Sequence, residues 1–288
     1  MIVIVGATGT IGSFVLERLM KLGVPVRALS RKPEKLRIQI GELGNSTIEI
    51  IAADASDPES LRIAFHGASQ IFLAISNSPR QIEFETSIIQ IAIEAGVEHI
   101  VKISSPAYEK RSPVAVAGWH QEIEKLLCNS ALTYTVLRPY AFMQNLLRYA
   151  PTVAAQHVFY GTMGQSPCNF IDCRDIADVA VEALTNRGVS GQIYTLTGSE
   201  IFSYPQIASK LSTLLGRQIR YVDMDGQVLL RHLIEFEHMP SWLASHVVEI
   251  QTMSTVVPEK PTDTVNLLLG RAPRTLDAFL DENIEKFR

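Results

Sequence analysis

Along the first half of the chain, short apolar runs alternate with longer segments in which apolar residues recur every three or four positions. Runs of the first kind predict buried strands, and segments of the second kind predict helices with one buried face. The predicted strands are Ile2–Val5, Val24–Ser30, Thr47–Ala53, Gln70–Ser76, His99–Ser104 and Leu132–Pro139. The predicted helices are Ser13–Leu22, a helix capped by Asp57, Gln81–Ala95 and Ala117–Cys128. This alternation indicates an α/β protein with a Rossmann-type, doubly wound parallel sheet.

The pattern changes in the second half of the chain, where helical spacing predominates. A helix is predicted to open at Tyr140, and Asp175 is expected to cap a helix over Ile176–Leu184, before a strand at Gln192–Thr197. The later predicted elements are a helix at Tyr204–Leu215, a strand at Gln218–Asp223, a helical stretch at Gln227–Met253 interrupted at Pro240, and a helix at Leu276–Phe287.

A length of 288 residues suits either one large domain or two modest ones. We expect a dinucleotide-binding domain at residues 1–150, rejoined by residues from about 166 to 197, and a smaller, mostly helical substrate domain at residues 151–288. Hydrophobic residues make up 47% of the chain and charged residues 19%, which is typical of a globular protein with a large core.

The net charge of −4 gives no electrostatic reason to expect nucleic acid or an anionic membrane as a partner. The longest apolar runs have the length of a strand, which is far too short to cross a bilayer. Three cysteines without C-x-x-C spacing indicate reduced thiols in a cytoplasmic protein. The histidines of the second half lack the spacing of zinc ligands, so we predict no metal site. The possible partners are a second copy of the chain, as a homodimer, or a regulatory protein.

The first predicted strand runs directly into a glycine-rich segment that precedes the first helix. A strand, a tight glycine turn and a helix N-terminus bind a dinucleotide pyrophosphate, because backbone N–H groups and the helix dipole point at the anion. The first glycine permits the sharp exit from the strand, the second the approach of the pyrophosphate, and the third close packing of the helix. The predicted contacts are Gly6, Thr8, Gly9, Thr10, Ile11 and Gly12. The spacing G-x-x-G-x-x-G differs from the general dinucleotide-binding fingerprint G-x-G-x-x-G. The alternative interpretation is an ordinary tight turn between a strand and a helix.

The second predicted strand ends at Ser30, Arg31 and Lys32, and the next acid is Glu34. An acid at this strand end would bind the ribose 2′-hydroxyl of NAD, whereas a guanidinium can bind a 2′-phosphate through two hydrogen bonds. We therefore predict NADP(H) in preference to NAD(H), with Arg31 as the main contact and Ser30 or Lys32 assisting. The alternative is a solvated Arg–Lys pair on the surface.

Further cofactor contacts are expected where the later strands end. Asp54 and Ala55 follow the third strand, and Asp54 could accept from the adenine amino group or only stabilise a turn. Ile75 and Ser76 end the fourth strand and open a loop that we expect to pass over the ribose and nicotinamide. Ser104 ends the fifth strand, where the nicotinamide is expected.

Candidate catalytic residues follow the fifth strand. Ser105 is expected to face the substrate, and Tyr108 comes next. Short-chain dehydrogenases pair such a tyrosine with lysine as Tyr-x-x-x-Lys, but the matching position here is Ser112, so that pair is absent. His120, at the edge of the apolar stripe of the next helix, could donate a proton or contact the nicotinamide ribose. Alternatively, it pairs with Glu124 one helical turn away.

A flat, apolar substrate ring could be walled by Tyr140, Phe142 and Asn145, which follow the sixth strand. An aromatic cluster at helical spacing is, however, more often part of a core. The sequence therefore leaves the walls of the substrate pocket as a hypothesis.

These segments together resemble the NmrA-like branch of the atypical short-chain dehydrogenases. The resemblance rests on the glycine loop, Arg31, Asp54 in AADASDPESL, GVEHIVKISS, HQEIEKLLCNSALTYTVLRPYAFMQNLL and the C-terminal GRAPRTLDAFL. The pattern is most similar to NADPH-dependent quinone reductases and triphenylmethane- or azo-dye reductases, which also carry histidine at the position of His120. The resemblance implies NADP binding through Arg31 and the glycine loop.

We therefore expect an NADPH-dependent reductase of a flat electrophile such as a quinone or a dye, with hydride supplied by the nicotinamide. His120 and Tyr108 are the candidates to polarise or protonate the substrate. The alternative is a non-catalytic NADP-binding redox sensor or regulator that acts through a protein partner, because the family also includes such proteins. An epimerase is disfavoured, since sugar oxidation needs a base at the hydroxyl.

Overall fold

The computed structural model describes residues 1–41, 47–106 and 114–288, which form two compact units. The first unit holds the described residues of 1–107, 118–139 and 173–195, and the second holds the described residues of 108–117, 140–172 and 196–288. The chain thus leaves the first unit at Pro139, where we expected a division near residue 150, and returns to it at Cys173.

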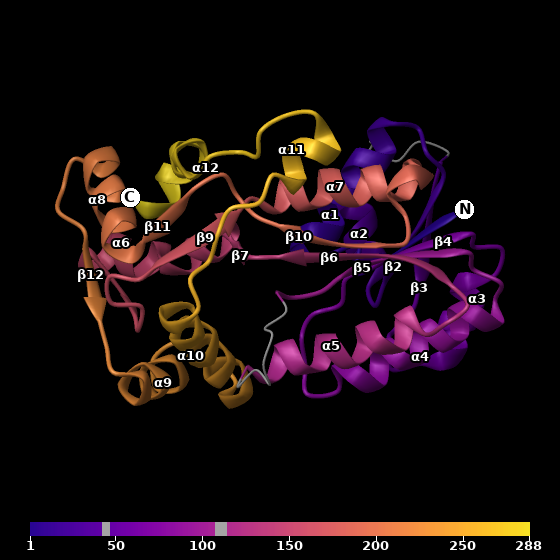
Figure 1. Cartoon of the computed structure of the whole chain (residues 1–288), viewed down its shortest axis with the longest axis horizontal. Helices are drawn as coiled ribbons and strands as arrows, with labels where there is room; N and C mark the ends of the chain where they lie inside the picture. Colours follow the sequence, from indigo (N-terminus) through magenta and orange to yellow (C-terminus); the bar gives the residue numbers. More distant parts are fainter. Residues whose placement is uncertain (42–46, 107–113) are drawn as a thin grey trace. The chain divides into compact units, whose positions relative to one another are not determined.

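The first unit is built on a seven-stranded sheet in the order β10-β6-β5-β4-β1-β2-β3 (Figure 1). The strands are β1 (Ile2–Val5), β2 (Val26–Ser30), β3 (Ile48–Ala52), β4 (Gln70–Leu73), β5 (His99–Ile103), β6 (Thr133–Pro139) and β10 (Gln192–Leu196). From β3 to β6 all neighbours pair in parallel. This confirms the predicted Rossmann-type sheet. The strand order reverses beside β1, so the carboxyl ends of β1 and β4 flank the place where such sheets bind ligands.

Helices of the described chain cover both faces of this sheet (Figure 1). One face carries α1 (Thr10–Lys21), α2 (Pro33–Ile40) and α7 (Cys173–Thr185), and the other carries α3 (Pro58–Phe65), α4 (Gln81–Glu94) and α5 (Ala115–Cys128). Helices α1 and α7 are joined by an ion pair between Arg18 Nε and Asp178 Oδ1 at 2.8 Å. On the other face, Ile88, Ile123 and their neighbours pack with the strand residues into one apolar core. The predicted helices α3, α4 and α5 therefore contribute their apolar stripes to this core.

Most expected elements of the first unit are present, with ends that differ by a few residues. Asp57 caps α3 as predicted, since its Oδ1 accepts hydrogen bonds from the N–H groups of Glu59 (3.1 Å) and Ser60 (3.3 Å). Helix α2 was not expected, and among its residues whose burial is described only Leu36 and Ile40 are buried. The expected cap at Asp175 is wrong, because α7 already begins at Cys173 and Asp175 lies in its first turn.

The second unit contains two small sheets, β11-β9-β7 and β12-β8, with helices around them (Figure 1). Its strands are β7 (Ala141–Phe142), β8 (Val158–Gly161), β9 (Pro167–Ile171), β11 (Ile201–Ser203) and β12 (Arg220–Asp223). Its helices are a 3-10 helix at Met143–Tyr149, α6 (Ala150–Gln156), α8 (Tyr204–Leu215), α9 (Gly226–Glu235), α10 (Ser241–Val256), α11 (Thr264–Leu269), α12 (Leu276–Asn283) and a terminal 3-10 helix at Ile284–Phe287.

The outcome of the predictions for this unit depends on how strong the local signals are. Helix α8 has the predicted bounds, and Gly216 ends it with a positive φ of 63°. The break at Pro240 is confirmed, because α10 begins directly after it. The helix predicted to open at Tyr140 is wrong, since Ala141 and Phe142 pair with β9 before a 3-10 helix follows. A short strand of two residues is too brief for a period of two to be recognised.

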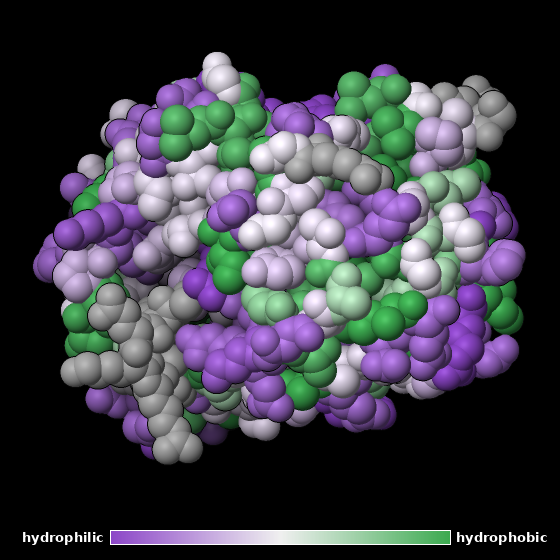
Figure 2. Space-filling view, turned by 45° about the vertical axis from the view of Figure 1, so that its right-hand side comes forward, coloured by the Kyte–Doolittle hydropathy of each residue, from purple (hydrophilic) through white to green (hydrophobic). Residues whose placement is uncertain are grey.

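In the part of the chain that the structure describes, no helix is long and apolar enough to span a membrane. On the face seen in Figure 2, hydrophobic residues occur in small groups separated by hydrophilic ones.

One partly buried carboxylate of the second unit links distant segments of the chain. Glu259 accepts hydrogen bonds from the backbone N–H of Asn169 in β9 (2.5 Å) and from Ser254 Oγ in α10 (3.1 Å). The Asn169 side chain in turn donates to the carbonyls of Gly198 (3.0 Å) and Glu200 (2.8 Å). Burial raises the pKa of Glu259 above its ordinary value, because the charged form loses water.

This raised pKa predicts a pH-dependent stability. A folded-state pKa above the unfolded value means that the stabilisation is complete below the unfolded pKa and is lost as pH rises through the folded one. The Glu259→Gln variant cannot ionise and still accepts a hydrogen bond. We expect its midpoint of thermal unfolding to gain on that of the wild type as pH rises above about 4.5. A difference that stays constant from about pH 4 to about pH 8 would contradict this assignment.

Candidate functional site

The glycine loop after β1 forms a cradle in which two positions tolerate no side chain. Gly6 has a φ of +93°, and a Cβ there would lie 2.0 Å from the carbonyl oxygen of Ala74. A Cβ on Gly12 would lie 2.1 Å from the carbonyl oxygen of Gly6. The Gly9 N–H donates to the same Gly6 oxygen at 2.9 Å. The roles predicted for Gly6 as a sharp exit and for Gly12 as a close packing point therefore agree with the geometry.

The N-terminus of α1 is arranged for an anion. Gly9 occupies the N-cap without any side-chain hydrogen bond, and the first turn of the helix holds no acidic residue. The first N–H groups of a helix have no partner within it, so those of Thr10, Ile11 and Gly12 can bind a phosphate. Thr8 and Thr10 are exposed beside them. A dinucleotide pyrophosphate fits this cradle in charge and in shape.

Arg31 and Asp54 extend from the ends of two paired strands, β2 and β3, in which Ser30 is the partner of Ala52. The Asp54 Oδ1 accepts hydrogen bonds from the backbone N–H (2.8 Å) and hydroxyl (2.7 Å) of Ser56. These bonds, with a smaller contribution from the positive charge of Arg31, lower the pKa of Asp54. The structure thus gives Asp54 the turn-stabilising contact that was the simpler of its two predicted roles.

The other two residues at the end of β2 differ in their exposure. Ser30 is buried, and its Oγ accepts a hydrogen bond from the Lys32 N–H at 3.1 Å. Arg31 and Lys32 are exposed. Ser30 therefore shapes the turn, while the two cations are accessible to a ligand.

The loops after β4 and β5 contain buried hydroxyls that are not satisfied within the described protein. Ala55 and Ile75 pack against the apolar core, and Ser76 is exposed. The hydroxyl groups of Ser78 and Ser105 are buried and have no hydrogen-bond partner among the described residues. A buried polar group without a partner is costly, and a bound ligand would remove that cost. Ser78 was not predicted, because a single serine in a loop carries no sequence signal.

Ser104, expected at the nicotinamide, is engaged within the protein. Its Oγ donates to Glu124 in α5, and Arg138 in β6 binds both oxygens of the same carboxylate, with Nε at 3.0 Å from Oε1. The hydrogen bonds to Glu124 raise the pKa of Arg138. The Glu124 carboxylate is thus occupied by Arg138 and Ser104, where the simpler interpretation of the sequence gave it to His120.

His120 lies in a buried polar cluster with Gln81, Glu85 and Lys102. Lys102 Nζ forms an ion pair with Glu85 Oε2 and lies 3.3 Å from His120 Nδ1. Gln81 Nε2 donates to Glu85 Oε1 at 2.8 Å and lies 3.3 Å from His120 Nε2 and 3.5 Å from Nδ1. Lys102 is fully buried, and Glu85 is nearly so. The cluster joins the start of α4, the end of β5 and the first turns of α5.

Sequence reasoning missed this cluster, although one signal was present. Lys102 is a cation inside the otherwise apolar strand His99–Ile103, which requires a buried counter-charge. Which acid supplies it depends on the packing of α4 against the sheet, and periodicity alone could not identify Glu85.

The remaining predicted site residues belong to other parts of the chain. Tyr108 lies outside the described residues. In the second unit, Tyr140 and Phe142 are half-buried and Asn145 is exposed. Burial and the charge of Glu259 raise the pKa of the Tyr140 hydroxyl.

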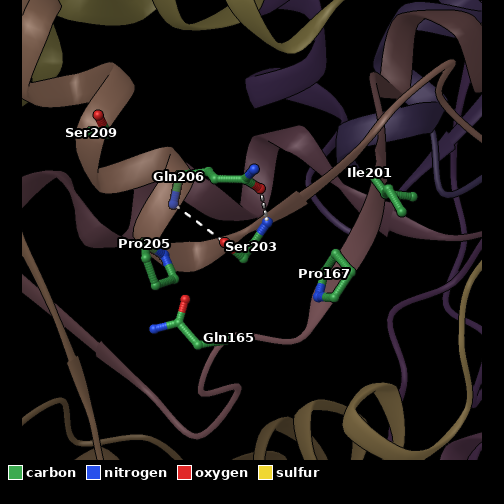
Figure 3. A pocket seen from close by; sticks show the side chains of 7 residues that line it. All are labelled: Gln165, Pro167, Ile201, Ser203, Pro205, Gln206 and Ser209. Carbon is green, nitrogen blue, oxygen red and sulfur yellow. Dashed lines mark hydrogen bonds between the residues drawn. The ribbon is translucent and has the colours of Figure 1, made fainter.

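A pocket of about 540 Å³ lies within the second unit, between β9, β11 and the start of α8 (Figure 3). It is lined by Gln165, Pro167, Ile201, Ser203, Pro205, Gln206 and Ser209. Ser203 and Gln206 form the reciprocal cap of α8, with each side chain bound to the backbone N–H of the other residue. No charged side chain and no predicted site residue is among the residues that line this pocket.

Comparisons with known proteins agree with the use of a dinucleotide cofactor, which the glycine loop indicates. A model of the NmrA-like family matches residues 1–280. The chain is 33% identical over its full length to an NAD(P)H azoreductase of Xenophilus azovorans, of which it covers 99%. It is 31% identical, again over its full length, to a (4-alkanoyl-5-oxo-2,5-dihydrofuran-3-yl)methyl phosphate reductase of Streptomyces griseus, covering 99% of that protein. Among solved structures, the Escherichia coli NADPH-dependent quinone oxidoreductase QOR2 in complex with NADPH has a TM-score of 0.88 at 28% identity, with 98% of this chain and 99% of that chain covered.

The cradle predicts opposite effects for two glycine variants. Gly9→Ala adds a Cβ that meets only the Gly6 carbonyl at 3.3 Å, so we expect thermal unfolding close to that of the wild type but clearly weaker NADPH binding. Gly12→Ala forces a Cβ against backbone, and we expect a loss of about 3 kcal/mol in unfolding free energy. Unfolding without cofactor and titration of NADPH fluorescence measure the two effects. If Gly9→Ala bound NADPH as tightly as the wild type, the assignment of the pyrophosphate site to this loop would be contradicted.

Proposed function

The chain belongs to the NmrA-like family, and we propose that it is an NADPH-dependent reductase of flat, conjugated electrophiles such as quinones and azo or triphenylmethane dyes. The full-length similarity to an azoreductase, in a chain whose cofactor cradle is intact, carries the proposal. The names of the three relatives describe substrates with an azo group, an unsaturated lactone and a quinone. Each of these groups is a conjugated acceptor of hydride.

The cofactor is held, in this proposal, by the glycine loop at its pyrophosphate and by Arg31 at its 2′-phosphate. The exposed Arg31 guanidinium can form two charge-assisted hydrogen bonds with a phosphate, and Lys32 adds a second positive charge. The buried hydroxyls of Ser78 and Ser105 would gain partners from the nicotinamide end. Bound NADPH would supply the hydride.

The residues expected to act on the substrate suit a conjugated acceptor better than an alcohol. Oxidation of an alcohol needs a base at its hydroxyl, and the Tyr-x-x-x-Lys pair that supplies it is absent. A quinone accepts hydride readily and needs only a hydrogen bond to its developing oxyanion. We propose His120 for that contact and Ser105 as a residue that faces the substrate.

We place the protein in the cytoplasm, because Cys128, Cys168 and Cys173 form no disulfide. Burial raises the pKa of the Cys168 thiol well above its ordinary value, which keeps it protonated and unreactive. Cys168 is therefore structural in this proposal and takes no part in the reduction.

The direct test of the function is oxidation of NADPH by the purified protein with a panel of quinones and dyes. We expect turnover with at least one conjugated acceptor and none with simple alcohols and NADP⁺. Tight NADPH binding without turnover on any acceptor would instead support a redox sensor that acts through a protein partner.

The preference for NADPH has its own test in Arg31→Ala. Loss of two charge-assisted hydrogen bonds of about 1.5 kcal/mol each predicts a Kd for NADPH raised by about 100-fold, with little change for NADH. The matched control is Arg37→Ala, which removes an exposed arginine from α2. Equal losses for NADPH and NADH, or equal effects of the two variants, would refute the role of Arg31 at the 2′-phosphate.

A further inference from the structure

Three buried side-chain atoms of the first unit have no hydrogen-bond partner among the described residues, and all three lie on the segments that follow β4 and β5. They are Ser78 Oγ, Gln81 Oε1 and Ser105 Oγ. We infer that these atoms bind the carboxamide of the nicotinamide. Gln81 Oε1 accepts from its amino group, and the serine hydroxyls bind its oxygen and its second N–H. The inference rests on NADPH as the cofactor of the proposed function, and it involves the first unit alone.

The three residues lie on segments that leave the sheet at the same edge, because β4 and β5 are neighbours that pair in parallel. The Gln81 N–H at the start of α4 donates to the carbonyl oxygen of Ser78 at 2.9 Å, which places both residues in one turn. Ser105 comes two residues after the end of β5. The ion pair between Lys102 in β5 and Glu85 in α4 links the two segments.

The Gln81 amide is oriented so that its oxygen, and not its nitrogen, is the unpartnered atom. Nε2 donates to Glu85 Oε1 at 2.8 Å and lies 3.3 Å from His120 Nε2. The other Glu85 oxygen pairs with Lys102, so a rotated amide would place its oxygen against a charged carboxylate. Gln81 is fully buried. An amide oxygen can only accept a hydrogen bond, so a ligand that satisfies it must bring an N–H or O–H donor.

The two serine hydroxyls complement this acceptor. Each hydroxyl can donate one hydrogen bond and accept others. A primary carboxamide has the matching groups, because its oxygen accepts and its amino group carries two N–H donors. Without a ligand all three protein atoms stay buried and unsatisfied, which costs free energy that binding of the carboxamide recovers.

The order of the strands indicates which part of the dinucleotide reaches these atoms. The glycine loop follows β1, and Arg31 follows β2 on one side of it, whereas β4 and β5 lie on the other side. A dinucleotide binds across the point at which the strand order reverses, so its nicotinamide half extends over β4 and β5. The carboxamide is the hydrogen-bonding group of the nicotinamide ring.

A carboxamide bound in this way determines the orientation of the ring. Rotation about the glycosidic bond moves the carboxamide to the opposite side, so the contacts are made in one orientation only. One face of the reactive carbon is then presented to the substrate, as hydride transfer requires. Because the substrate must lie against the same ring, a contact of Ser105 with the carboxamide also places Ser105 beside the substrate.

Alanine variants of the serines separate a ligand contact from a structural one. Ser78→Ala and Ser105→Ala each remove a buried group without a partner, so we expect the thermal unfolding midpoint of the cofactor-free protein to be unchanged or raised. We expect the Kd for NADPH, measured by calorimetric titration, to rise about fivefold in each variant.

The matched control for these variants is Ser130→Ala. Ser130 Oγ donates to the Leu127 carbonyl oxygen (2.7 Å) and accepts from the Leu132 N–H (3.2 Å), so its loss should lower the unfolding midpoint and leave the Kd unchanged. An unchanged Kd in Ser78→Ala or in Ser105→Ala would overturn the inference, as would a midpoint that falls as far as that of the control.

A cofactor analogue distinguishes the carboxamide from the ribose hydroxyls, which also carry donors. Reduced 3-acetylpyridine adenine dinucleotide phosphate has a methyl group in place of the amino group. We expect the wild type to bind it about tenfold more weakly than NADPH, and Gln81→Met to bind the two with similar affinity. Gln90→Met replaces an exposed glutamine of α4 and should keep the wild-type ratio. Equal affinities in the wild type, or an unchanged ratio in Gln81→Met, would overturn the inference.

Both measurements concern binding, so they are independent of turnover. If Gln81→Met fails to fold, the wild-type ratio and the two serine variants decide. Discrimination against the analogue without turnover on any acceptor would support the carboxamide site and remove only the proposed reductase activity. Turnover without that discrimination would overturn the carboxamide site alone.

Discussion

The approach of backbone to backbone at Gly6 is the constraint on which the rest of the structure depends. The carbonyl oxygen of Gly6 receives the Gly9 N–H and lies against Gly12, while Gly6 itself lies against Ala74 at the end of β4. Strand β1, strand β4 and helix α1 can meet this closely only because neither glycine has a side chain. Since β1 and β4 are also where the strand order reverses, the same contact opens the place where the loops of the other strands converge.

How far the sequence could predict the structure depended on whether a signal was local. The glycine loop, the cap at Asp57 and the end of α8 at Gly216 are determined by neighbours within a few residues, and each was predicted correctly. Among the described side chains of helix α2 only Leu36 and Ile40 are buried, which is too few to form the stripe that identifies a helix. The helix expected at Tyr140 failed for a different reason, because Ala141 and Phe142 take their conformation from pairing with β9.

The residues of the candidate site also differ in how far local sequence could predict them. Arg31 and the glycine loop are predicted from their position after a strand, and in the structure Arg31 is exposed while Gly9 is the N-cap of α1. The partners of His120 come from α4 and β5, which lie 39 and 18 residues away along the chain. The nearest carboxylate in sequence, Glu124, is held by Arg138 instead. Buried charges choose their partners by packing, so spacing on one helix was a poor guide to them.

The return of α7 and β10 to the first sheet has a consequence for how the protein is made. During synthesis, the first unit is still incomplete after β6 has left the ribosome. Its last elements, α7 and β10, follow later in the chain, and the unit extends to residue 195. By then, residues 140–172 of the second unit have already left the ribosome without the core residues Leu276, Phe279 and Phe287, which are all fully or almost fully buried. The second unit therefore stays incompletely folded until nearly the whole chain has been synthesised. Nascent chains of intermediate length should depend on chaperones, because they expose apolar surface that is buried in the complete unit.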